Sequence, residues 1–108
     1  MTDVLAVITN LPDQACAERL AEHLVAERLA ACVNILAPCR SIYRWQGTTE
    51  HADEIPVLIK TTRASYAAVE RAILALHPYE LPEIVAVPAS LGLGAYLDWV
   101  SGEVASPP

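Results

Sequence analysis

The most constraining feature of this sequence is a pair of apolar, β-branched runs in the middle of the chain, separated by polar residues. The first run covers 32–36 and resumes at 41–45, and the second covers 55–59. Residues 47–51 carry turn and solvent-exposed chemistry, so the pattern predicts a long β-hairpin. Pro38 cannot donate a ladder hydrogen bond, so we expect the first arm to kink there and the far half to project from the domain.

Helices and further strands flank this hairpin. Before the hairpin we expect a strand at 4–8, ended by Asn10, and a helix capped by Asp13. After the hairpin we expect a helix that is capped by Thr61-Thr62 and ends near Leu76. A strand at 84–87, stopped by Pro88, and a short helix at 95–101, stopped by Gly102, complete the chain of elements. The order β-α-β-β-α-β followed by a short C-terminal helix predicts an α+β, ferredoxin-like domain. We expect a single domain over 1–102 and a short tail over 103–108.

The predicted sheet is apolar on both faces. Right-handed crossovers place both long helices on one face, so the other face of a monomer should be polar. In the first strand, however, Leu5 and Val7 alternate with Val4, Ala6 and Ile8, and all five side chains are apolar. Each such side chain contributes roughly 1.5–3 kcal/mol when it is buried. We therefore expect the bare face to be covered by other copies of the chain.

Composition limits the class of protein. The hydrophobic fraction is 54%, yet no apolar run approaches the roughly 18 residues of a membrane-spanning helix. Residues 1–3 do not resemble the start of a signal peptide. A net charge of −6 argues against nucleic acid and acidic membranes as partners. Three cysteines without a C-x-x-C pair are typical of free thiols, which favours a cytoplasmic location.

Several segments resemble the CutA family of divalent-cation tolerance proteins. They are LAACVNI at 29–35, SIYRWQG at 41–47, KTT at 60–62, HPYELPEI at 77–84 and YLDW at 96–99. The resemblance covers residues 3–100 in order and at compatible spacing. It implies a ferredoxin-like subunit in a tight homotrimer, a role in copper or divalent-metal tolerance, and kinship with the trimeric PII-type signalling proteins.

The resemblance also implies positions for a copper site. The family's ligands are a Cys at the end of the first strand and a His-His pair before Pro-Tyr, and these positions hold Thr9, Leu76 and His77 here. Of these three residues, only His77 has a side chain that commonly ligates transition metals.

His77 is followed by Glu80 and Glu83, a mixed imidazole and carboxylate set. These groups suit Cu(II) or another divalent cation, and binding through the imidazole should weaken below about pH 6.5. The alternative is a histidine that ends the helix, followed by two solvated loop acids.

A second group of residues is predicted to lie at a cleft or interface between subunits. Tyr43 and Trp45 on the projecting arm are expected to pack between subunits, with stacking on a ligand as the alternative. Glu54 and Lys60 are expected to form structural ion pairs, with ligand binding as the alternative. Tyr79 joins this group.

No nucleophile triad, phosphate-binding loop, dinucleotide fingerprint or H-E-x-x-H motif occurs, so an enzyme is not expected. The favoured hypothesis is a trimeric, cytoplasmic protein of the metal response that binds copper or another divalent cation. The alternative is a PII-like signalling trimer that binds a small ligand at subunit clefts and docks an unidentified protein. A third hypothesis is a purely structural assembly platform.

Overall fold

A computed structural model describes residues 3–105, so Met1, Thr2 and the last three residues of the predicted tail lie outside the described part. The elements are β1 (Val4–Leu11), α1 (Gln14–Ala26), β2 (Cys32–Ile35), β3 (Cys39–Trp45), β4 (Thr48–Thr62), a 3-10 turn (Arg63–Ser65), α2 (Tyr66–Leu76), β5 (Val85–Pro88) and α3 (Gly94–Glu103). Asp13 caps α1 as predicted, because its side chain accepts a hydrogen bond from the backbone N–H of Cys16 at 2.8 Å.

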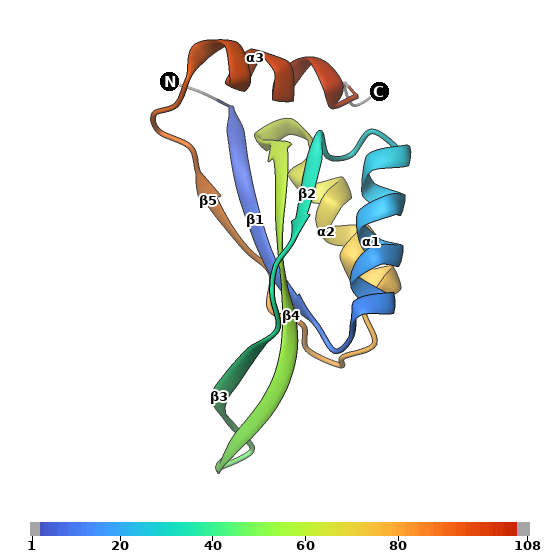
Figure 1. Ribbon diagram of the computed structural model, residues 1–108, viewed down its shortest axis with the longest axis vertical. Helices are drawn as coiled ribbons and strands as arrows, with labels where there is room; N and C mark the ends of the chain where they lie inside the picture. The colour runs from blue at the N-terminus through green and yellow to red at the C-terminus, as the bar shows by residue number, and fades with distance from the viewer. Residues whose placement is uncertain (1–2, 106–108) are drawn as a thin grey trace.

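The main sheet has the strand order β2-β4-β1-β5, and each neighbouring pair is antiparallel. Helices α1 and α2 lie together on one side of the sheet, and α3 crosses one end (Figure 1). This arrangement confirms the predicted α+β, ferredoxin-like fold. The main core lies between the sheet and the two long helices; its fully buried members include Val7, Leu20, Leu24, Val57 and Ile73.

The predicted long hairpin is present. Residues 36–38, which include Pro38, interrupt the first half of the hairpin. The strands on either side of this break, β2 and β3, both pair with β4. Residues 39–54, called the arm from here on, project away from the rest of the domain (Figure 1). The break and the projection are as the sequence predicts.

The hairpin turn is shorter than predicted. It consists of Gln46 and Gly47 alone, whose φ angles of 49° and 81° are left-handed. Two left-handed residues match the twist of the flanking strands, so pairing resumes at once with Trp45 opposite Thr48. Residues 48–51, predicted as turn, therefore belong to β4.

The ends of three other elements differ from the prediction. β1 continues through Leu11 rather than ending near Ile8, because it stays in register with β4. The predicted helix cap at 61–62 is wrong: both threonines belong to β4, and α2 begins only at Tyr66. Pro88 is the last residue of β5 instead of the residue after it, which an edge strand tolerates.

Helix α3 covers one end of the sheet over a second, smaller core of Val4, Val100 and Val104. The helix passes through Gly102, which was predicted to stop it, and ends at Glu103. Arg28 donates hydrogen bonds to the carbonyls of both residues, at 3.2 and 3.1 Å. The backbone N–H of Ala105 donates in turn to the carbonyl of Arg28, so residues 103–105 belong to the folded domain. Within residues 3–105, no helix combines the length and the apolar composition needed to cross a membrane.

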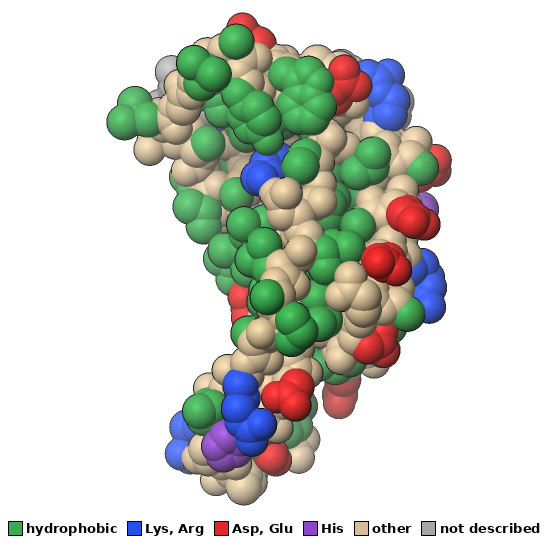
Figure 2. All heavy atoms as spheres, in the orientation of Figure 1, with side chains coloured by type: hydrophobic (Ala, Val, Ile, Leu, Met, Phe, Trp, Pro, Cys, Tyr) green, Lys and Arg blue, Asp and Glu red, His purple; other side chains and the backbone are tan. Residues whose placement is uncertain are grey.

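The sheet face opposite α1 and α2, called the open face, is largely apolar; it includes Ala6, Ile8, Leu58, Val85 and Val87. Ile8 lies in register between Leu58 and Val85, at the centre of this face. Val85 and Val87 are 49% and 48% exposed. Figure 2 shows hydrophobic side chains gathered over the sheet. The predicted coverage by other copies stays a prediction.

Two fully buried threonines on the core side offer a matched test of packing. The hydroxyl of Thr9 has no hydrogen-bond partner within residues 3–105, whereas that of Thr61 donates to the Leu29 carbonyl at 2.6 Å. An unsatisfied buried polar group costs about 1–3 kcal/mol. We therefore expect Thr9→Val to raise the free energy of unfolding by about 1 kcal/mol and Thr61→Val to lower it by at least about 1 kcal/mol. Urea unfolding measures both variants, and changes of the same sign would contradict this account.

Candidate functional site

A groove of about 780 Å³ lies between the arm and the loop at 77–84 that follows α2. The predicted site residues that line it are Tyr43, Trp45 and Glu54 from the arm and Tyr79, Glu80 and Glu83 from the loop. Residues predicted separately for metal binding and for a cleft therefore meet in one groove. Lys60 and His77 do not line it.

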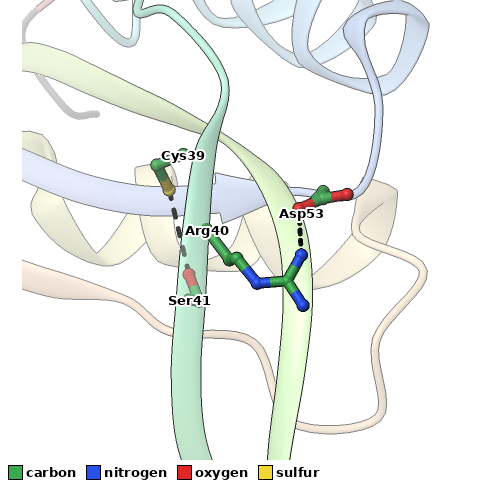
Figure 3. A network of polar contacts seen from close by, with 4 residues as sticks. All are labelled: Cys39, Arg40, Ser41 and Asp53. Atoms are coloured by element: carbon green, nitrogen blue, oxygen red, sulfur yellow. Dashed lines mark hydrogen bonds and ion pairs between the residues drawn. The ribbon is translucent and has the colours of Figure 1, made fainter.

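Side chains of the arm alternate between its two faces. Cys39 and Ser41 share the face that looks toward the groove, with Sγ and Oγ 3.8 Å apart, and Ser41 lines the groove. Arg40 lies on the outer face, where its guanidinium donates to Asp53 at 3.4 Å (Figure 3).

The same alternation continues along the rest of the arm. Tyr43 and Trp45 belong to the groove face, while Arg44 and His51 belong to the outer face with Arg40. Figure 2 shows basic and histidine side chains gathered on the arm. The arm therefore presents two aromatic rings to the groove, while its two arginines lie on the other side together with Thr49, His51 and Asp53.

His77 is 8% exposed, and both of its ring nitrogens are engaged. Nε2 contacts the carbonyl of Asn10 at 2.6 Å, and Nδ1 accepts a hydrogen bond from the backbone N–H of Tyr79 at 3.1 Å. A carbonyl can only accept and an N–H can only donate, so these partners assign the ring proton to Nε2. Metal coordination by His77 would have to break one of the two bonds, which favours the alternative of a structural histidine at the helix end.

Asn10 connects His77 to the acidic side of the groove. Its carbonyl accepts from His77, and its side-chain amide donates to Glu83 at 3.2 Å. Asn10 itself lines the groove. Sequence reasoning missed this role because it ended the first strand before Asn10; a longer strand would have placed the amide beside the loop.

Glu54 and Tyr79 face each other across the groove. Glu54 is 8% exposed. Partial burial raises the pKa of Tyr79 to about 12, and a hydrogen bond to the Glu54 carboxylate and its negative charge act in the same direction. Tyr79 therefore stays a neutral phenol throughout the physiological pH range and can donate a proton to a hydrogen bond.

Lys60 lies on the open face, where its ammonium donates to the side-chain oxygen of Asn34. Within residues 3–105 the only ion pair joins Arg40 and Asp53, so neither Glu54 nor Lys60 forms an ion pair inside one subunit, and their predicted pairing at an interface or cleft stays a prediction. The two residues lie in different parts of β4: Glu54 belongs to the part that pairs with β3, and Lys60 belongs to the part inside the main sheet.

In the described part of the chain, no three His, Cys, Asp or Glu side chains lie close enough together to hold a metal ion. His77, Glu80 and Glu83 therefore do not form the predicted mixed cluster within one subunit. The physical reason is that His77 turns toward the end of β1, while the two glutamates line the groove.

Comparisons with known proteins agree with this architecture. The family model of CutA1 divalent ion tolerance proteins matches residues 5–103. The divalent-cation tolerance protein CutA of Thermus thermophilus is 46% identical over 94 residues, which cover 87% of this chain and 91% of that protein.

Solved structures show the same similarity. CutA from Xylella fastidiosa has a TM-score of 0.93 at 45% identity, covering 96% of this chain and 100% of that one. A PII-like protein CutA from Nostoc has a TM-score of 0.86 at 37% identity, covering 94% and 97% of the two chains. With a matched family model over nearly the whole chain and relatives at this identity, the chain belongs to the CutA1 family of divalent ion tolerance proteins.

Proposed function

We propose that this chain acts in the response to divalent cations as a homotrimer, and that it binds such cations weakly at the acidic wall of the groove. Glu80 and Glu83 are the proposed ligands, and His77 supports them from behind through Asn10. The observation that carries the proposal is the set of charged residues in the groove: among residues 3–105, three carboxylates line it, and no Lys or Arg does.

The chemistry of these side chains supports the proposal. Carboxylate oxygens bind divalent cations, and one or two carboxylates plus water molecules suffice for a weakly held ion. The hydrogen bond from Asn10 fixes one oxygen of Glu83, as partners of metal ligands commonly do. The affinity should fall short of that of a site with three or four protein ligands.

We propose that the open face supports the trimer. Three antiparallel strands contribute apolar side chains to it, and Val85 and Val87 are about half exposed in one subunit. Covering them removes apolar surface from water, which drives association. The three free cysteines are the support for a cytoplasmic location.

Calorimetric titration with Cu(II) and Zn(II) tests the metal proposal. We expect saturable binding to the parent protein and at least a tenfold weaker affinity in a Glu80→Gln, Glu83→Gln double variant, which keeps the shape and removes two charges. Glu18→Gln, Glu22→Gln is the control because it makes the same charge change on α1, away from the groove. If both double variants bind the metals as the parent does, the groove carboxylates are not the ligands.

A second function has its own support. The groove is large enough for an organic molecule, and the solved Nostoc relative is described as PII-like. We therefore keep, as an alternative proposal, a signalling trimer that binds a small ligand at this groove and docks a partner protein.

A further inference from the structure

The groove contains a buried carboxyl group, that of Glu54, which has no cationic partner in the described part of the chain. Glu54 is 8% exposed and lines the groove, yet within residues 3–105 no cationic side chain pairs with it. The phenol of Tyr79 interacts with this carboxyl group, which helps to raise the phenol's pKa to about 12, so the phenol is itself neutral. A buried carboxylate without a counter-ion is unfavourable unless a cation completes its surroundings.

Three aromatic rings share the groove with this carboxylate. Tyr43, Trp45 and Tyr79 all line it, and these residues are 37–44% exposed. The negative face of an aromatic ring attracts an ammonium or guanidinium group, but it offers a divalent metal ion none of the oxygen or nitrogen ligands that such ions prefer. Rings together with a carboxylate thus select organic cations.

We propose that the groove binds an organic cation, an ammonium or guanidinium group on a carbon skeleton, with Glu54 opposite the charge and Tyr43, Trp45 and Tyr79 around the skeleton. A volume of about 780 Å³ lies within the range of small-molecule sites. This inference goes beyond a metal response, because its ligand is of another chemical class and its key acid is Glu54 rather than Glu80 or Glu83.

The cation has two possible sources. One is a free small molecule. The other is an arginine of a second copy of the chain: Arg44 lies on the outer face of the arm and has no ion-pair partner within residues 3–105. Both sources offer the same chemistry to Glu54, and the experiment separates them.

The test is calorimetric titration of the full-length protein with putrescine and with agmatine, using 1,4-butanediol as the uncharged analogue. For a free ligand we expect saturable binding of either cation, no binding of the diol, and at least a tenfold loss of affinity in Glu54→Gln. Glu22→Gln on α1 is the matched control and should bind as the parent does. In a Trp99→Phe background, the emission of Trp45 should change with the same saturation.

For an arginine from a second copy, we expect the parent to bind neither cation and Arg44→Gln to bind both. The proposal is overturned if neither the parent nor Arg44→Gln binds a cation. It is also overturned if, in whichever of these two proteins binds putrescine, the diol binds equally well, or the addition of Glu54→Gln weakens binding no more than the addition of Glu22→Gln. The diol comparison needs no substitution at Glu54, so it holds even if Glu54→Gln misfolds. If the protein binds the organic cations but neither Cu(II) nor Zn(II), only the metal proposal is refuted. If it binds the metals but no organic cation, only the organic-cation proposal is refuted.

Discussion

Replacing Ile8 with glutamate is expected to reduce the solution mass from about three times 11.6 kDa to the 11.6 kDa of one chain. Ile8 lies at the centre of the open face, between Leu58 and Val85. In an assembled trimer a glutamate there would be a buried charge without a partner, which is strongly unfavourable. In an isolated subunit the same glutamate is solvated, so the fold should survive. Light scattering measures the mass, and circular dichroism checks the fold.

Val25→Glu is the control for this experiment. Val25 is also an exposed hydrophobic residue, but it lies on α1, on the other side of the sheet. We expect this variant to keep the parent mass. If Ile8→Glu keeps it too, the open face is not the interface, and a parent protein with the mass of one chain would refute the trimer itself.

His77→Ala is expected to lower the free energy of unfolding by about 2–3 kcal/mol, whether or not metal is present. The change removes two hydrogen bonds, each contributing about 0.5–1.5 kcal/mol, and leaves the Asn10 carbonyl and the Tyr79 N–H without these partners. Urea unfolding at one fixed protein concentration, with and without chelator, measures the effect. His51→Ala is the control, because His51 is exposed on the arm, and it should change stability by less than about 0.5 kcal/mol.

Unchanged stability together with a loss of copper binding would identify His77 as a metal ligand. In that case His77→Ala would unfold like the parent in chelator but would lose copper binding in a calorimetric titration. A ligand role also predicts that copper binding to the parent weakens as the solution is acidified, because a protonated imidazole cannot coordinate. Loss of stability without loss of copper affinity identifies a structural histidine.

Local rules predicted the features that depend on single residues. Pro38 cannot donate a ladder hydrogen bond, and the first arm of the hairpin breaks beside it. Pro78 disfavours helical backbone in the residue before it, and α2 ends at Leu76. Local rules failed at the hairpin turn, where two left-handed residues, Gln46 and Gly47, made the turn shorter than the polar run.

The site depends on contacts between distant segments, which a periodic pattern does not reveal. Glu54 and Tyr79 were both predicted at a cleft, but nothing in the sequence placed them opposite each other. The type of residue at His77 indicated a metal ligand. Its two backbone partners, one of them 67 positions away, favour the structural alternative within one subunit, and the sequence pattern does not indicate them.

The structure of the arm affects how binding in the groove can be detected. Over residues 39–54 it is a ribbon of only two strands, and such a ribbon is marginally stable by itself in water. The rest of β4 pairs with β1 on one side and with β2 on the other, so disorder in the arm need not spread into the core. We therefore expect a ligand in the groove, or another copy of the chain in contact with the arm, to supply much of the arm's rigidity. Backbone order at the tip is then a readout of binding that requires no change of fold.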